Sequence, residues 1–441
     1  MWDRLAEIDP FSGLPWPIQV LFFVALILSV IQLGLVLSLS IRGGSEQRRP
    51  SATADEAQFL WLFLVPALNE EVTIADTVAR LEQIRVTHRR FVVINDGSSD
   101  RTGEILAEHP SPDLQVLTRV LPDARKGKAA ALNQAWSDVR AQMPPELADR
   151  FGEERTLVVI VDADGRLDPG FADDVASRFL DPRVGGVQLA VRIYNRAKAL
   201  AYMQDVEFRV FGSVFQMGRS AWGSAGMGGN GQINRLAALT QIAEQNIEAG
   251  QADGPWRHRL TEDQDLGLSL FAAGWLGQQE MRHAVDQQGL SSYRRLLRQR
   301  IRWCQGNMQA ISRVGVFRGT SLSRGARLDG AYWLLQPIVQ SIIGVSTVTA
   351  LALLVFAPDL VQPHWDVSVF LLLLVLGFGG TAIGVFRAEM IAGQGRFWRA
   401  AALIVPYLLY CWSLLPIYVV AWWRQLLRRD EWAKTARESI G

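Results

Sequence analysis

The sequence predicts an α/β domain with a mainly parallel sheet, joined to α-helical transmembrane segments. Between Arg42 and Gly330, short apolar strands alternate with helical stretches. Fully apolar strands in such an alternation are typical of parallel sheets that are covered on both faces. The 45 Lys and Arg and the 44 Asp and Glu residues avoid four stretches of at least 20 residues: Phe11–Ile41, Ala331–Pro358, Val367–Phe386 and Ala400–Trp423. Each is long enough to span a bilayer core, which needs about 20 apolar helical residues.

The flanking charges predict how these segments lie in the membrane. Residues 1–45 read as a retained N-terminal transmembrane anchor, because no basic region precedes the apolar stretch as in a cleaved signal peptide. Acidic residues dominate before this stretch, and Arg42, Arg48 and Arg49 follow it. Since basic residues favour the cytoplasmic side, we expect an integral inner or plasma membrane protein with a cytoplasmic catalytic domain.

The C-terminal part of the chain gives a conflicting signal. Residues 331–424 are expected to hold about three transmembrane helices, and residues 425–441 form a basic tail. Four complete spans would place this tail outside, against the rule that basic residues stay inside. Either the rule fails at the tail or one segment does not cross fully. Pro406 and Pro416 make the last segment the best candidate for a kink or a re-entrant turn.

Composition excludes several classes of protein. The formal net charge of +1 argues against nucleic acid as the main partner. Outside the four uncharged stretches the chain has the charge density of a soluble domain, so long disordered tracts are not expected.

Residues 46–288 are expected to form the soluble α/β domain. Strands are expected at 59–66, 91–94 and 157–161, because each range is a short apolar run next to turn residues. Helices are expected at 71–84, from about 102 onward, and at 126–141. In open parallel sheets, ligands bind beyond the carboxyl ends of the strands. The residues that follow the three strands are therefore the first candidates for a functional site.

Each of these strands ends in a polar cluster. The clusters are Asn69-Glu70, Asp96-Gly97-Ser98 and Asp162-Ala163-Asp164. Alone, any of them could be a turn or a helix cap. Carboxylates gathered at one sheet edge repel unless a cation or hydrogen-bond donors neutralise them. Asp162 and Asp164 can both offer oxygen ligands to a hard cation, which predicts Mg²⁺ or Mn²⁺ as cofactor.

Five motifs occur in an order that resembles membrane-embedded glycosyltransferases of family 2, in particular processive cellulose, hyaluronan and chitin synthases. They are Pro66-x-x-Asn69-Glu70, Asp96-Gly97-Ser98, Asp162-x-Asp164, Thr261-Glu262-Asp263 and Gln299-x-x-Arg302-Trp303. The resemblance covers about residues 58–310. It implies a nucleotide-sugar-binding domain of the GT-A type and an inverting, metal-dependent transfer.

The resemblance also implies roles on the donor side. Asp96 is expected against the uridine, with Asn69 and Glu70 in the same pocket. Lys128 would lie near the diphosphate or the base. Asp162 would contact the sugar nucleotide near the metal, and Asp164 would hold the metal.

On the acceptor side, the resemblance makes Asp263 the base that takes a proton from the acceptor hydroxyl. Gln299 and Arg302 would bind the diphosphate, while Trp303 would stack on the acceptor sugar. These three residues lie in a region, 289–330, that predicts amphipathic interface helices, because arginines alternate there with apolar residues. Glu262, Gly229 and Asn230 are also expected near the acceptor. The glycine-rich stretch 226–235 departs from the shorter signature of cellulose and chitin synthases, so sugar identity and linkage stay open.

These expectations combine into a function. The chain should transfer a hexose from a nucleotide sugar, first of all a UDP-sugar, to a growing β-linked glycan at a lipid bilayer. Passage of the product through the membrane, with or without export partners, is left open. One alternative is a single-addition enzyme with a lipid acceptor. Others are a GDP-mannose donor and an inactive scaffold that senses nucleotide sugars.

Overall fold

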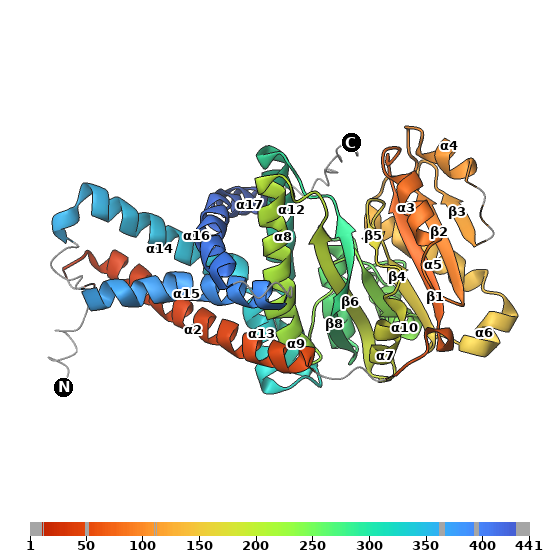
Figure 1. Cartoon of the computed structure of the whole chain (residues 1–441), viewed down its shortest axis with the longest axis horizontal. Coiled ribbons are helices and arrows are strands. Elements are labelled where there is room, and N and C mark those ends of the chain that lie inside the picture. The colour runs from red at the N-terminus through yellow and green to blue at the C-terminus, as the bar shows by residue number, and fades with distance from the viewer. Residues whose placement is uncertain are drawn as a thin grey trace.

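The computed structural model describes residues 11, 13–48, 53–109, 111, 113–360, 367–391 and 397–428. The α/β domain lies at one end of the molecule and the long apolar helices lie at the other (Figure 1). Between them stand α8 (Ala199–Val210) and α12 (Tyr293–Ala310), which contact both parts. Residues 1–10 and most of the predicted basic tail, from residue 429 onward, lie outside the described residues.

One eight-stranded sheet forms the centre of the α/β domain, in the order β3-β2-β1-β4-β7-β6-β8-β5. Its strands are β1 (Leu60–Ala67), β2 (Arg89–Asn95), β3 (Leu114–Thr118), β4 (Thr156–Ile160), β5 (Arg166–Leu167), β6 (Val184–Ile193), β7 (Gln232–Arg235) and β8 (Leu276–Gln287). Four of the seven neighbouring pairs are parallel, and β7 and β5 run antiparallel to their neighbours. The predicted α/β class with a mainly parallel sheet is confirmed, with the two antiparallel strands as an addition.

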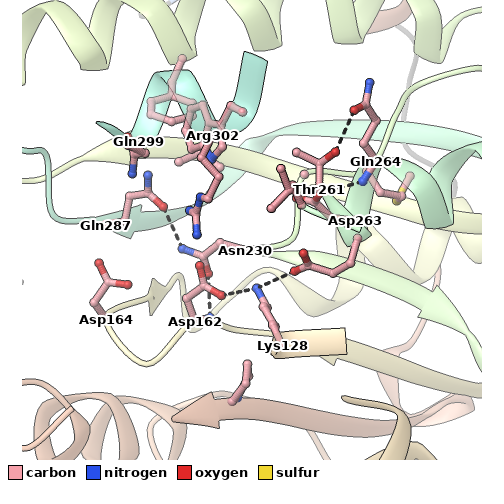
Figure 2. A pocket seen from close by; sticks show the side chains of 18 of the residues that line it. Lys128, Asp162, Asp164, Asn230, Thr261, Asp263, Gln264, Gln287, Gln299 and Arg302 are labelled. Atoms are coloured by element: carbon pink, nitrogen blue, oxygen red, sulfur yellow. Dashed lines mark hydrogen bonds and ion pairs between the residues drawn. The ribbon is translucent and has the colours of Figure 1, made fainter. Parts of the chain in front are cut away.

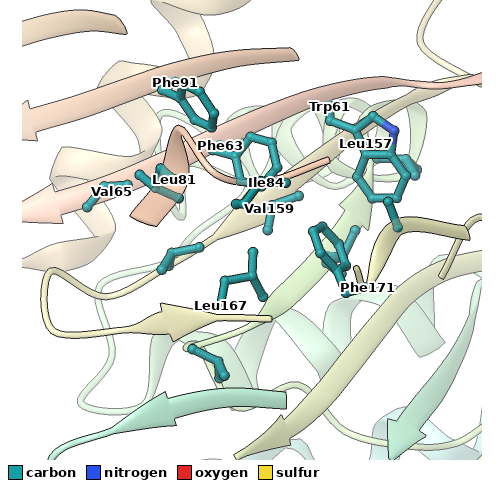
Figure 3. Packing of buried hydrophobic residues seen from close by; sticks show 14 of the residues in the cluster. Trp61, Phe63, Val65, Leu81, Ile84, Phe91, Leu157, Val159, Leu167 and Phe171 are labelled. Carbon is teal, nitrogen blue, oxygen red and sulfur yellow. The ribbon is translucent and has the colours of Figure 1, made fainter. Parts of the chain in front are cut away.

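The alternation of side chains along β1 explains the two layers around the sheet. Trp61, Phe63 and Val65 face one core, and Leu60, Leu62 and Leu64 face the other. Figure 3 shows the first core, where the aromatic rings of β1 meet Phe91 and Phe171. Each fully buried side chain of this size contributes about 1.5–3 kcal/mol. The apolar strands therefore anchor the sheet edge from which the functional loops extend.

Helices cover both faces of the sheet. They are α3 (Ile74–Leu81), α4 (Thr102–Ala107), α5 (Lys128–Ala141), α6 (Pro145–Phe151), α7 (Ala172–Phe179), α10 (Leu236–Glu248) and α11 (Glu262–Ala272), with short η1 (Glu56–Gln58) before β1. The predicted strands 59–66, 91–94 and 157–161 agree with β1, β2 and β4 within two residues at each end. The predicted helix 71–84 is shorter, because residues 70–73 form a turn in which Thr73 N donates to Glu70 O.

Three helices among the described residues are long and apolar enough to cross a membrane. They are α2 (Trp16–Gln47), α14 (Gln336–Phe356) and the stretch Phe397–Leu426. The last stretch consists of α16 (Phe397–Ser413) and α17 (Pro416–Leu426), which are separated by a turn just before Pro416. The predicted kink is thus present there, because proline lacks the N–H that would continue the helix. The remaining uncharged stretch falls in α15 (Val367–Ile391).

The anchor helix α2 packs closely against the segment that follows α8. This segment consists of the π-helix η2 (Phe211–Gln216) and α9 (Met217–Ser220). A Cβ at Gly218 would lie 2.7 Å from Leu39, so only glycine permits this approach of the two backbones. Between α12 and α14, η3 (Ile311–Gly319) and α13 (Arg324–Leu334) complete the predicted interface region. The candidate membrane helix α2 is therefore packed directly on η2 and α9, and α9 in turn contacts β8 of the sheet.

Candidate active site

A cavity of about 570 Å³ opens at the edge of the sheet where β1, β2 and β4 end. The strand register explains why, since Ala67 pairs with Asn95 of β2, and Leu64 pairs with Ile160 of β4. The residues that follow each strand must therefore meet at one edge. The predicted site residues that line the cavity are Glu70, Asp96, Lys128, Asp162, Asp164, Asn230, Glu262, Asp263, Gln299, Arg302 and Trp303.

Two predicted site residues, Asn69 and Gly229, lie just behind the lining. Asn69 has a positive φ of 53°, and its Oδ1 accepts a hydrogen bond of 2.8 Å from Ser99 N. It therefore ties the loop after β1 to the loop after β2. Gly229 has a φ of +82°, and a Cβ there would lie 2.9 Å from Asp263 Oδ2. Any larger residue would displace the predicted base, so this glycine shapes the site from behind.

Asp96 is held in place from two sides. It is buried, and its Oδ1 accepts hydrogen bonds from the guanidinium of Arg119 and from the backbone N–H of Arg125, the latter at 3.1 Å. A buried carboxylate is stable only when it is paired in this way. The loop after β3, which carries both arginines, therefore fixes the orientation of Asp96 at the cavity wall.

Lys128 is the electrostatic centre of the site. Its Nζ lies 2.6 Å from Asp162 Oδ1 and 3.9 Å from Glu262 Oε1. Figure 2 shows Lys128 pointing toward Asp162. Burial lowers the pKa of the Lys128 ammonium, but the carboxylates of Asp162, Glu262 and Asp263 outweigh it and raise the pKa above its usual value. Lys128 is therefore a permanent cation that links the loop after β4 to the start of α11.

Asp263 and Glu262 form a coupled pair in the first turn of α11. Burial raises the pKa of the Asp263 carboxyl, while Lys128 and the N–H of Gln264 oppose this shift. Burial and the neighbouring Asp263 raise the pKa of Glu262 to about 7. A carboxylate with a raised pKa is a stronger base, which suits proton removal from an acceptor hydroxyl.

Asp162 and Asp164 are the two carboxylates after β4 that could hold a divalent cation. Both line the cavity, and Asp164 is 6% exposed. No group of three or more His, Cys, Asp or Glu side chains suited to a metal occurs among the described residues. Magnesium sites commonly combine one or two carboxylates with substrate phosphates. Both carboxylates line the same cavity, so either could hold such a cation beside the donor phosphates.

The α12 helix contributes Gln299, Arg302 and Trp303 to the opposite wall. Behind Trp303, the buried guanidinium of Arg300 lies 4.1 Å from the centre of the indole ring. Arg300 also donates to Glu207 Oε2 of α8 at 2.7 Å. An ion pair stacked on the ring restricts its rotation. The predicted sugar platform is therefore a fixed surface.

The cavity extends toward the membrane helices along an apolar wall. Phe208 of α8, Phe211 and Phe215 of η2, Trp333 of α13 and Tyr407 of α16 line this part. Because α16 belongs to a stretch able to cross a membrane, the cavity reaches from the sheet edge to a candidate span.

Several lining residues carry no motif that the sequence reveals. Glu207 lies inside α8, two residues after Asp205, and it belongs to none of the motifs found in the sequence. Gln287 ends β8, and Asn230 Nδ2 donates to its Oε1 at 3.1 Å. The rule that found Asp96 depends on an apolar strand, and β8 carries several polar and charged residues, so this rule does not find Gln287. His283 bridges Asp168 and Asp174, each at 2.9 Å, and does not line the cavity.

Residues 60–306 match the family described as "Glycosyltransferase like family 2". This match covers more than half of the 441 residues. The chain therefore belongs to glycosyltransferase family 2, and it is an enzyme of the glycosyltransferase class.

Curated relatives specify what the chain is similar to. It is 29% identical over 293 residues to a beta-monoglucosyldiacylglycerol synthase of Trichormus variabilis. This alignment covers 64% of the present chain and 57% of the relative. It is 23% identical over 272 residues to a poly-beta-1,6-N-acetyl-D-glucosamine synthase of Staphylococcus aureus. This alignment covers 61% of the present chain and 59% of the relative. The chain thus matches less than two thirds of each relative's length.

A solved structure supports the fold. A mannosyltransferase of Pyrobaculum calidifontis, in complex with GDP-Man and Mn²⁺, aligns with a TM-score of 0.51 at 16% identity. The alignment covers 93% of this chain and all of that one. The predicted GT-A type of fold is confirmed.

Proposed function

We propose that this chain is an inverting, metal-dependent membrane glycosyltransferase that adds a hexose from a UDP-sugar to a growing β-linked glycan. The observation that supports this most is the single cavity that holds the predicted donor residues, the predicted base and the α12 motif together. The curated relatives make glycolipid or polysaccharide, so both product classes stay within the family's range.

The residues divide the reaction between them. The nucleotide would bind on the side of Asp96 and Glu70, and the diphosphate would lie between Lys128 and Arg302. Asp263 would take the proton of the acceptor hydroxyl. At the same time the hydroxyl oxygen of the acceptor would bond to the anomeric carbon, and the bond from that carbon to the diphosphate would break. A divalent cation at Asp164 would neutralise charge on the leaving diphosphate. Trp303 would support the acceptor sugar with its ring face.

A second candidate function is the addition of one sugar to a lipid acceptor. The apolar wall of Phe211, Phe215 and Tyr407 favours it, because such a wall suits an acyl chain better than a glycan. The likeness to a glucosyldiacylglycerol synthase points the same way.

A donor screen with product analysis tests both candidates. Purified protein is incubated with labelled UDP-glucose, UDP-N-acetylglucosamine or GDP-mannose, with Mg²⁺ or Mn²⁺, and the products are separated by mass. We expect transfer from one UDP-sugar and products of many lengths. Products that each gain one sugar on a lipid would favour the second candidate. If the protein binds a donor but transfers no sugar to any acceptor, both candidate functions would be wrong. The remaining alternative would be an inactive scaffold that senses nucleotide sugars.

The metal assignment predicts a specific binding defect. In the Asp164→Asn variant, the gain in UDP affinity that Mn²⁺ provides should fall by about tenfold or more, equivalent to ~1.4 kcal/mol. Titration calorimetry of UDP with and without Mn²⁺ measures this gain. Asp149→Asn, an exposed change on α6, is the matched control and should behave as the parent does. An unchanged Mn²⁺ effect in Asp164→Asn would remove Asp164 from the metal site.

A further inference from the structure

We propose that a second cavity, between the catalytic domain and the ends of α2, α15 and α16, binds the phosphate headgroup of an anionic membrane lipid. Its volume is about 470 Å³. The arginines in its wall are Arg178, Arg192, Arg196, Arg209, Arg282 and Arg399. Four carboxylates share the wall with them. The chemistry that such a wall recognises is a phosphate ester, which arginine binds with paired hydrogen bonds.

This cavity is separate from the active site. Helix α8 stands between the two, with Glu207 on the active-site side and Asp205 and Arg209 on the other. Positions two residues apart point to nearly opposite faces of an α-helix. No residue lines both cavities.

Most of the buried charges in this region already have partners. Glu280 accepts a hydrogen bond from Arg178 at 2.9 Å and lies 3.3 Å from Arg282. Asp205 pairs with Arg209 at 2.9 Å, and Arg209 also pairs with Glu389 of α15. Arg178, Arg209 and Arg282 therefore hold the wall together, and their charge is largely used within the protein.

Arg192 and Arg196 differ from these structural arginines. Both are exposed at the end of β6. Within the described part of the chain, no carboxylate lies within ion-pair distance of Arg192, and the nearest to Arg196 is Asp205 at 3.9 Å. Arg192 stands opposite Asp286 in the register of β6 and β8. Burial raises the pKa of the Asp286 carboxyl and both arginines oppose this rise, but neither forms an ion pair shorter than 3.9 Å among the described residues. Two arginines in the wall of this cavity therefore keep N–H groups that can donate to a ligand.

A buried hydroxyl in the same wall has no partner either. Ser213 is 1% exposed and lines the cavity, and its Oγ has no hydrogen bond among the described residues. It lies in the π-helix η2, and π-turns inside helical segments often occur at functional sites. A buried hydroxyl without a partner is unusual, because its desolvation is then uncompensated. The residue that carries this hydroxyl belongs to the wall of the cavity, so the wall contains a polar group that the protein itself does not satisfy.

The position of the cavity decides between a lipid and a free phosphate. Its wall includes Glu46 and Gln47 at the end of α2, Ile391 at the end of α15, and Arg399 in the first turn of α16. If these helices cross the bilayer, as the proposed function assumes, their ends lie at the level of the lipid phosphates. A bound headgroup would connect α15 and α16 to α8, the helix that also carries Glu207.

Lipid binding to the purified full chain tests this site. The probes are phosphatidylglycerol, phosphatidylcholine and soluble glycerol 3-phosphate, and retained lipid is measured by native mass spectrometry in detergent. The variant is Arg192→Gln/Arg196→Gln. The control is Arg140→Gln/Arg183→Gln, two arginines of the catalytic domain outside both cavities, of which Arg183 is highly exposed.

We expect phosphatidylglycerol to bind the parent and the control more tightly than phosphatidylcholine does. The Arg192→Gln/Arg196→Gln variant should bind it about thirtyfold more weakly, which converts to ~2 kcal/mol for two arginines beside an anionic lipid. Equal weakening in the control, or no weakening in the variant, would overturn the proposal. Glycerol 3-phosphate that binds as tightly as the lipid would overturn the lipid assignment.

UDP binding serves as the second readout. It should be the same in all forms, which shows that the variants fold. Because this readout belongs to the active site, a loss of UDP binding in the parent would count against the proposed function and not against the lipid site.

Discussion

Asp263→Asn should slow sugar transfer by roughly 10²- to 10⁴-fold while UDP still binds, because general-base catalysis contributes a factor of this size. The amide keeps the shape of the side chain and the hydrogen bond from Gln264 N, which is 2.8 Å long in the parent. It cannot accept the proton of the acceptor hydroxyl. Steady-state kinetics should therefore show a loss in kcat with little change in the donor KM, and calorimetry with UDP should show normal affinity.

Two further variants make this result specific. Asp253→Asn removes an exposed carboxylate ten residues earlier and should leave kcat unchanged. Glu262→Gln tests the neighbour whose pKa lies at about 7. Normal transfer by Asp263→Asn together with a large loss in Glu262→Gln would move the role of base from Asp263 to Glu262.

Much of the fold and the donor side of the site could be predicted because they depend on local patterns. The alternation in β1 determines both cores, and the strands that it predicts end where the acidic clusters begin. Asp96, Asp162 and Asp164 follow such strands directly, so parallel pairing must bring them to one edge. Asp263 and Arg302, which the motif order assigned to the site, line the same cavity.

Contacts between distant parts of the chain could not be predicted in this way. Arg119 binds Asp96 from the next strand, and no spacing rule links the two residues. Glu207 and Arg300 are 93 positions apart in the sequence, and their ion pair forms between α8 and α12. No local pattern predicts that these two residues are in contact. The cavity at Arg192 and Arg196 depends on where three apolar helices end in space. Hydropathy gives the length of such helices but not the surfaces on which they pack.

The membrane segments show the same limit at a smaller scale. Length and lack of charge identified the apolar helices, since both are properties of consecutive residues. The turn before Pro416 was expected from the proline itself. The packing that follows from this turn was not expected. Helix α17 packs along α12, where Arg424 Nε donates to Gln305 Oε1 at 3.1 Å. The last apolar stretch thus contacts the helix that carries the acceptor motif.

Lys128→Met should reduce kcat/KM at pH 7 strongly and move the acid limb of its pH profile upward by about one unit or more. The acid limb moves upward because a positive charge is removed next to two carboxylates. Lys128 lowers the pKa of both Glu262 and Asp263, although burial keeps each above its usual value. Without the cation, both carboxylates hold their protons to higher pH. The base is then protonated at neutral pH, and activity should recover in part as the pH rises.

Matched variants separate this electrostatic role from donor binding. Lys126→Met removes an exposed lysine two residues earlier, which pairs with Asp123 at 2.8 Å, and should leave the profile unchanged. Lys128→Arg keeps the charge and should hold the acid limb near its original position, even if the donor KM rises. Should Lys128→Met raise the donor KM without moving the limb, Lys128 would be a diphosphate ligand alone. A shifted limb would instead make the ion pair with Asp162, 2.6 Å long, part of a network that tunes the base, because the same cation touches both the donor loop and α11.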